Sequence, residues 1–271
     1  MQNYSLSKAM QRKLHFDLVT SGVDMEKAYT LVMCLKSIPH ITEHGETTFI
    51  NVVKRKFVKS YDELEEFLIT VEQDISNPNV YISANTFFIP KATNTCIYRF
   101  GYLFVDIDCH TENTYVTEHD LNSLYIHLCE EHFGKTVPVP SLIVSTGRGL
   151  HLYWKIKPLP YNRKYITYWN SVMKNLLEVL DSLDFTVIDP KGKENKVFKV
   201  DKAVKNASRV LRLAGTFNSK ARKFTDIVDI NTNEYTLSEI NQEYLVPFIK
   251  AKIASRKPKG KKTAGKKKSK R

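Results

Sequence analysis

The sequence predicts a mixed fold of class α/β (α+β), in which helices cover a mixed or antiparallel sheet. Helical and extended patterns alternate along residues 1–249, and no internal repeat is visible. Interleaved elements of this kind favour a layered domain with one central sheet. With 271 residues, 42% of them hydrophobic and 26% charged, the chain has the composition of a globular protein of one large or two small domains.

Capping signals and apolar spacing define the helices. Ser60 and Glu63 form a capping box ahead of an apolar stripe, and Thr117 is a second N-cap, with Gly134 past the end of its helix. Seven large apolar residues share one face of residues 162–180, which indicates a core helix. The helices are predicted over residues 61–75, 117–133 and 162–180, with a last short helix from 236.

Segments rich in β-branched and aromatic residues separate these helices and predict the strands. The glycines at 147 and 149 indicate a tight turn that joins two of them as a β-hairpin. The strands are predicted over residues 48–53, 79–85, 102–108, 141–145, 150–156 and 224–230.

The positive charge lies at the C-terminus. Residues 250–271 contain 12 Lys or Arg and no acid, so residues 1–249 carry 29 bases and 29 acids. Like-charge repulsion and few apolar residues predict a disordered tail. We interpret its lysines as a nucleic-acid tether, with a solubilising extension or an anionic membrane surface as alternatives. The tether residues are Lys261, Lys262, Lys266, Lys267 and Lys268.

Cysteine usage and hydropathy predict a cytoplasmic protein. Cys34, Cys96, Cys109 and Cys129 form no CxxC pair and are most simply reduced thiols. There is no apolar signal-peptide core near Met1 and no run long enough to span a membrane.

Two carboxylates end an apolar predicted strand. Asp106 and Asp108 are two residues apart and therefore project from one face. Paired carboxylates repel unless a cation lies between them, and oxygen ligands suit Mg²⁺ or Mn²⁺. A solvated strand end is the alternative interpretation.

A second group surrounds the glycine turn. Arg148 could reach a phosphate from this turn. In the strand that follows, His151 and Tyr153 share one face and the apolar Leu152 lies on the other. We expect the apolar face to pack inward and His151 to face a ligand site.

A third group begins at Val200 and Asp201. Asp201 precedes Arg209, Arg212 and Lys220, which converge on a Gly-Thr turn. Arg, a bidentate fork, and Lys, a point charge, together suit a polyphosphate. A basic surface loop is the alternative.

In this order and approximate spacing, the three groups resemble the archaeo-eukaryotic primase superfamily, specifically the small primase-polymerases of plasmids, phages and integrative elements. The family has an acidic pair on a strand, a His after a small-residue turn, and a hydrophobic residue followed by Asp. An Arg-x-x-Arg and Gly-Thr-x-Asn-x-Lys stretch follows in many members. Residues 79–85 also look like the family's N-terminal module, so the resemblance covers about residues 75–235. The matching residues are Asp106, Asp108, His151, Val200, Asp201, Arg209, Arg212, Gly215, Thr216, Asn218 and Lys220.

The resemblance implies one composite domain with its active site between two modules. We expect an N-terminal α/β module over residues 1–95, an RNA-recognition-like catalytic module over 96–249, and the tail over 250–271. The implied activity is template-directed nucleotidyl transfer by two metal ions, Mg²⁺ or Mn²⁺. Single-stranded DNA and NTPs or dNTPs are the implied partners. We expect a monomer and a separate helicase, because the chain lacks a Walker A phosphate loop.

Site roles follow from the same resemblance. Three acids, Asp106, Asp108 and Asp201, would hold the metal ions, with Asp189 as an alternative to Asp201. The family usually has Ser two residues before the His, where this chain has Gly149. The residues expected to bind the nucleotide are Ser145, Arg148, Gly149, His151, Arg209, Arg212 and Lys220.

Other functions fit the sequence less well. A non-catalytic initiator would not need three acids at a phosphate site, and a nuclease need not hold pyrophosphate. We expect no zinc site, although six Cys or His residues cluster over residues 109–132. In the helix predicted there, only Cys129 and His132 can share a face.

The tail interpretation is testable by truncation. Deleting residues 251–271 removes 11 of the 12 tail charges. We expect weaker binding to single-stranded DNA and a salt slope shallower by about 0.7 for each phosphate that is no longer bound. Turnover at saturating template and the melting temperature should change little. An unchanged salt slope would show that the tail does not touch DNA.

Overall fold

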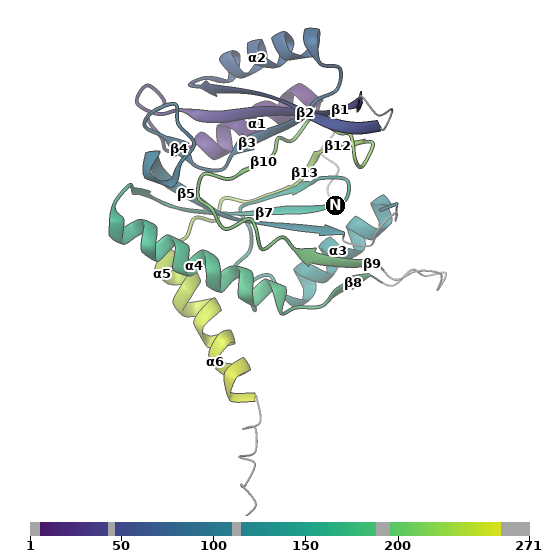
Figure 1. Ribbon diagram of the computed structural model, residues 1–271. Helices are drawn as coiled ribbons and strands as arrows, with labels where there is room; N and C mark the ends of the chain where they lie inside the picture. Colours follow the sequence, from purple (N-terminus) through teal and green to yellow (C-terminus); the bar gives the residue numbers. More distant parts are fainter. Residues whose placement is uncertain (1–5, 43–46, 110–114, 188–195, 256–271) are drawn as a thin grey trace, which may run out of the picture.

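The computed structural model describes residues 6–42, 47–109, 115–187 and 196–255, and it consists of two stacked antiparallel sheets (Figure 1). The upper sheet has four strands in the order β10-β3-β1-β2. Its strands are β1 (Thr30–Ile41), β2 (Thr47–Val58), β3 (Asn79–Ser83) and β10 (Val210–Arg212).

The lower sheet has seven strands. Six of them follow the order β13-β6-β7-β5-β9-β8, and β4 pairs with β5 beside this path. Its strands are β4 (Thr86–Phe87), β5 (Ile97–Cys109), β6 (Leu142–Ser145), β7 (Gly149–Pro160), β8 (Phe185–Val187), β9 (Lys196–Val200) and β13 (Asp226–Ile230). A separate small hairpin joins β11 (Phe217–Asn218) to β12 (Lys223–Phe224).

Helices cover the outer face of each sheet (Figure 1). Helix α2 (Tyr61–Asp74) lies over the upper sheet, while α3 (Glu118–Glu131) and α4 (Arg163–Asp181) lie below the lower one. The predicted apolar stripe of α4 is buried, and Trp169 Nε1 donates to the Tyr102 carbonyl in β5 (3.1 Å). One part of the core therefore lies between α4 and the lower sheet. Within the described residues, no helix is long and apolar enough to cross a membrane.

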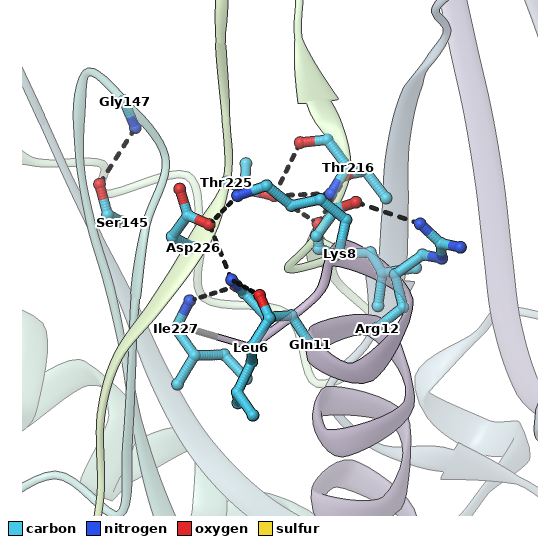
Figure 2. Close-up of polar contacts among 12 residues, drawn as sticks. Leu6, Lys8, Gln11, Arg12, Ser145, Gly147, Thr216, Thr225, Asp226 and Ile227 are labelled. Atoms are coloured by element: carbon cyan, nitrogen blue, oxygen red, sulfur yellow. Dashed lines mark hydrogen bonds and ion pairs between the residues drawn. The ribbon is translucent and has the colours of Figure 1, made fainter. Parts of the chain in front are cut away.

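Helix α1 (Lys8–Thr20) connects the two layers (Figure 2). Gln11 accepts from the backbone N–H of Ile227 in β13 (2.9 Å) and donates to Asp226 (2.9 Å). On the upper side, Arg12 pairs with Glu65 of α2 (2.7 Å) and donates to the Gly215 carbonyl (3.3 Å). One helix therefore fixes the lower sheet, α2 and the turn after β10 relative to each other.

The predicted elements are confirmed where local signals are strong. Every predicted helix and strand overlaps an observed one, within a few residues at most ends. Helices α1 and α6, strand β1 and the short strands β4 and β8–β11 were not predicted.

The chain does not divide between the sheets at residue 95. Strand β10, from the predicted catalytic module, pairs with β3 in the upper sheet. Strand β4, from the predicted N-terminal module, pairs with β5 in the lower one. The two modules therefore exchange strands, and neither sheet is built from one continuous segment.

The prediction of disorder is wrong for residues 250–255. Helix α6 (Val246–Ser255) continues through them from the irregular helix η2 (Ile240–Leu245), which follows α5 (Leu237–Glu239). Phe248 and Ile249 pack against the core, so the helix is anchored before its exposed end at Ile253 (61% exposed). The rest of the tail, including the five tether lysines, lies outside the described residues.

Candidate active site

The predicted site is centred on Asp106, in the middle of the lower sheet. In the β5–β7 register, Asp106 lies directly opposite His151. On its other side, the β5–β9 register continues to Asp201, whose backbone N–H donates to the Asp106 carbonyl (2.8 Å). Directly opposed residues point to the same face of a sheet. Asp106 therefore lies in a row between His151 and Asp201.

Asp106 is a carboxylate held largely out of solvent, with 24% of its side chain exposed. Burial raises its pKa, but His151, Arg212 and Arg209 outweigh burial and bring the pKa below its usual value. The Asp106 Oδ1–His151 Nε2 distance is 3.7 Å. At neutral pH the carboxyl group is therefore ionised, as a metal ligand must be.

Asp108 lies one step along the same strand face, opposite Gly149. Arg148 in the turn approaches it, with Nε 3.6 Å from Asp108 Oδ1, while Arg148 Nη2 donates to the Cys109 carbonyl (2.7 Å). A Cβ added at Gly149 would lie 1.9 Å from the Ile107 carbonyl oxygen and 2.8 Å from Asp108 Cα. The departure from the family's Ser thus has a steric reason, because no side chain fits beside the acidic pair.

The upper sheet supplies the opposing cations. Arg212 in β10 lies over the ring of Tyr81 in β3 (5.0 Å to the ring centre), and its Nη1 donates to Asn79 Oδ1 (2.8 Å). Burial lowers the Arg212 pKa, while Tyr81, Asp106 and Asp108 act to raise it. A guanidinium stays charged under these conditions, so Arg212 faces the acidic pair as a fixed cation.

A cavity of about 260 Å³ opens between the two sheets at this point. It brings together seven of the ten residues expected at the metal and nucleotide sites: Asp106, Asp108, Arg148, His151, Arg209, Arg212 and Lys220. Its remaining lining residues are Tyr81, Thr146, Val210, Leu211 and Asn218.

The other three expected residues do not line the cavity. Ser145 Oγ accepts from the Gly147 N–H (3.3 Å; Figure 2), and the Gly149 N–H donates to Thr146 Oγ1 (3.0 Å). The Gly149 N–H is thus used inside the turn, Ser145 Oγ serves there as an acceptor, and Thr146 lines the cavity instead.

The Asp201 carboxylate is engaged beside the cavity. Its Oδ1 accepts from the Ala203 N–H (2.8 Å), and Arg209 Nη2 lies 3.6 Å from its Oδ2. Among the described residues, no three His, Cys, Asp or Glu side chains are grouped closely enough to hold one metal ion. The alternative ligand Asp189 lies outside the described residues.

The acidic pair nevertheless fits a hard divalent cation. Asp106 and Asp108 present two carboxylates on one face, both line the same polar cavity, and oxygen donors of this type suit Mg²⁺ and Mn²⁺.

The Cys and His residues over residues 109–132 were considered above as a zinc site. Within that segment, His127 contacts His132 ring to ring (5.1 Å), and its Nε2 lies 3.2 Å from the Asp184 carbonyl oxygen. His110 of that segment lies outside the described residues.

Comparison with solved structures identifies the fold. The archaeo-eukaryotic primase domain of the cyanophage S-2L primase-polymerase aligns with a TM-score of 0.50 and 16% sequence identity, over 86% of this chain and 95% of that domain. This chain has the archaeo-eukaryotic primase fold. The resemblance drawn from the ordered motifs is therefore confirmed at the level of the fold.

One curated relative also matches by sequence. A replication protein of Clostridium perfringens is 29% identical over 172 residues, which is 64% of this chain and 37% of that protein. The chain thus corresponds to little more than a third of the relative. No protein-family model matches the chain.

Two residues with no role predicted from sequence, Asn218 and Tyr81, line the cavity. Asn218 Nδ2 donates to the Thr146 carbonyl (2.7 Å), which ties the Gly-Thr turn to the glycine turn. Asn218 was part of the recognised motif but had no assigned role. Tyr81 gave no signal in sequence, since only the β3–β10 pairing brings it beside Arg212.

A third missed residue, His15 of α1, packs behind the cavity. His15 is fully buried, lies edge-on to Tyr153 (5.4 Å between ring centres) and accepts at Nδ1 from the Ala214 N–H (3.1 Å). Burial, with a smaller effect of His151, lowers its pKa to about 3, so it stays neutral. The strand face with His151 and Tyr153 is therefore covered by α1, contrary to the expectation that only the apolar face packs inward.

The steric account of Gly149 is testable by substitution. Gly149→Ala should destabilise the fold by at least about 2 kcal/mol, because the Ile107 backbone must move away from the new methyl group. Gly101→Ala is the matched control in the partner strand, since its Cβ would meet nothing within 4 Å. Denaturant unfolding of both variants measures the difference. Equal stabilities would contradict the close approach of β5 and β7.

Proposed function

We propose that the chain is the catalytic domain of a DNA primase-polymerase, which builds a primer or short DNA strand on a single-stranded template. One observation carries the proposal: the cavity sets a carboxylate pair on the lower sheet against Arg209, Arg212 and Lys220. Metal-dependent transfer of a nucleotide from a triphosphate needs both groups at one place.

In this proposal Asp106 and Asp108 hold the divalent ions, and Asp201, whose backbone N–H donates to the Asp106 carbonyl (2.8 Å), is the third ligand. When bound, Mg²⁺ or Mn²⁺ would neutralise the triphosphate and lower the pKa of the attacking 3′-hydroxyl. The chain's own cations would then fix the triphosphate in line with that hydroxyl.

The acid–base distances support such a role. Arg148–Asp108, His151–Asp106 and Arg209–Asp201 are separated by 3.6, 3.7 and 3.6 Å. These are ion-pair distances, longer than those of most direct hydrogen bonds. Each base is placed to meet a phosphate oxygen while its acid meets a cation.

The wider setting also belongs to this proposal. The replication-protein relative supports a role in replication, and we assign this role to the DNA of a plasmid, phage or integrative element. We assign single-stranded DNA and NTPs or dNTPs as substrates, a monomer in the cytoplasm as the working form, and a separate helicase as the source of unwound template.

De novo synthesis is the direct test. The protein is incubated with circular single-stranded DNA, Mn²⁺ or Mg²⁺ and labelled nucleotides, and products are resolved by length. Labelled products that need both template and metal would support the proposal. Shortening of an end-labelled linear strand without synthesis would instead identify a nuclease.

Removing the acidic pair tests the catalytic assignment. The double variant Asp106→Ala, Asp108→Ala should stay folded and keep DNA binding, because it relieves repulsion between two carboxylates. Its nucleotide incorporation should fall by at least about a hundredfold, since metal stabilisation of charge contributes several kcal/mol. Asp62→Ala, on the exposed side of α2, is the control. Incorporation near the wild-type rate would show that the site is misplaced.

Removing His151 tests the nucleotide side. His151→Ala should raise the KM for the incoming nucleotide about tenfold, as expected for loss of one charge-assisted contact, with a smaller change in template affinity. His119→Ala, on the exposed face of α3, is the matched control. A collapse of template affinity with an unchanged nucleotide KM would place His151 in the DNA groove or the core.

A further inference from the structure

The cavity continues outward along one face of the upper sheet. Strand pairing sets Arg55, Met33, Tyr81 and Arg212 in one row across β2, β1, β3 and β10. Opposed residues share a face, and Tyr81 and Arg212 line the cavity. Arg55 and Met33 therefore lie on the same face of the sheet as the lining of the proposed active site.

The same face runs on along the β1–β2 hairpin, beyond the end of β3. Every second residue belongs to it, so Arg55 is followed by Val53, Asn51 and Phe49, with Pro39 opposite Phe49. Val53 is 40% exposed and Phe49 69% exposed. At about 3.4 Å per residue, this face extends about 20 Å from Arg55 to Phe49. We call these residues, from Arg55 to Phe49, the hairpin face.

The hairpin face carries one base of its own. Of the four Lys or Arg in β1 and β2, Arg55 lies on this face, whereas Lys36, Lys54 and Lys56 lie on the opposite one. On the opposite face, Lys54 pairs with Asp74 of α2, whereas the exposed Arg55 belongs to the hairpin face. The turn from β11 to β12 lies beside β3, where Ser219 contacts Asn79 (2.8 and 3.1 Å).

That turn adds two exposed bases beside the same path. Lys220 lines the cavity, and Arg222, two residues on, is exposed. Basic side chains thus lie along the route from the cavity to the hairpin, and the exposed ring of Phe49 lies at its outer end.

We propose that the hairpin face binds a single-stranded polynucleotide, the template strand as it leaves the cavity, with a base stacked on Phe49 and a phosphate on Arg55. The inference rests on the proposed function and assigns its template path. Aromatic rings interleaved with bases are the usual means of binding single strands without sequence preference. Exposed apolar side chains do not by themselves favour a protein partner or a second copy on the hairpin face, because the opposite face exposes Ile38 and Ile50 as well (41% and 50%).

The two faces of one hairpin supply matched variants. Phe49→Ala should weaken binding of a fluorescein-labelled, mixed-sequence 20-nucleotide DNA about tenfold, the loss expected for one stacked base. Arg55→Ala should also weaken it and make the slope of log K against log salt shallower by about 0.7. Ile50→Ala, next to Phe49 but on the other face, should leave the Kd unchanged. Phe49→Tyr should restore most of the affinity, because its ring can still stack.

Three outcomes would overturn the inference. Equal losses in Phe49→Ala and Ile50→Ala would show a general effect on the hairpin, and unchanged affinity in Phe49→Ala would show that no base stacks there. A change of molar mass in light scattering, with an unchanged Kd for DNA, would identify a contact between copies of the chain.

A second readout separates this inference from the proposed function. Binding of Mn²⁺-dATP to the cavity should be unchanged in Phe49→Ala and Arg55→Ala, because neither residue lines it. If the double Asp variant retains synthesis while Phe49→Ala loses DNA affinity, the template path stands and the catalytic assignment fails. If the double Asp variant loses synthesis while Phe49→Ala keeps its DNA affinity, the catalytic assignment stands and the template path is rejected.

Discussion

The charges of the site are arranged around one partly buried anion. A carboxylate that is held largely out of water costs several kcal/mol unless opposite charges and hydrogen bonds surround it. Asp106 receives His151 from its own sheet, but Arg212 and Arg209 come from the segment that crosses to the other sheet. The upper sheet thus supplies a cation, Arg212, for the carboxylate of the lower sheet, and packing of the two sheets against each other offsets the charge of Asp106. Breaking the contact between the sheets would leave the charge of Asp106 unpaired.

This requirement explains why the chain exchanges strands between its layers. Strand β10 is only three residues long, too short to be stable alone. Its position is stabilised by pairing with β3, by the contact of Arg212 with the Tyr81 ring, and by the Arg212–Asn79 hydrogen bond. The turn that follows approaches α1 closely: at Gly215, with φ of +74°, a Cβ would lie 2.1 Å from the Lys8 carbonyl oxygen. Helix α1 therefore fixes the point at which the basic segment turns back toward the lower sheet.

The sequence analysis succeeded where chemistry and geometry are local. Spacing along α4 predicted its buried face, and alternation along β5 put Asp106 and Asp108 together, because both patterns depend on residues a few positions apart. The roles of Tyr81 and His15 and the pairing of β10 were not predicted, because each depends on a partner more than 100 residues away. The expected role of Gly149 assumed that its N–H points into the cavity, and residue types do not show that this N–H donates to Thr146 Oγ1 within the turn. The helix through Ser255 was missed because tail composition was averaged over residues 250–271, although Phe248 and Ile249 anchor its first turn.

Charge sorting, rather than net charge, makes the cavity suitable for a polyanion. Residues 1–249 carry equal numbers of acids and bases, yet four Lys or Arg side chains and only two carboxylates line the cavity. The acids sit on the rigid lower sheet, while three of the four cations come from the segment that includes β10 and β11. A metal–triphosphate complex has the same polarity, with cations toward the carboxylates and phosphates toward the opposite wall. With four bases and two acids, the cavity attracts an anion, and low-dielectric surroundings strengthen this attraction at close range. In the function proposed above, a cation carried by that anion would meet the two carboxylates, so a metal–triphosphate ligand would match both walls of the cavity.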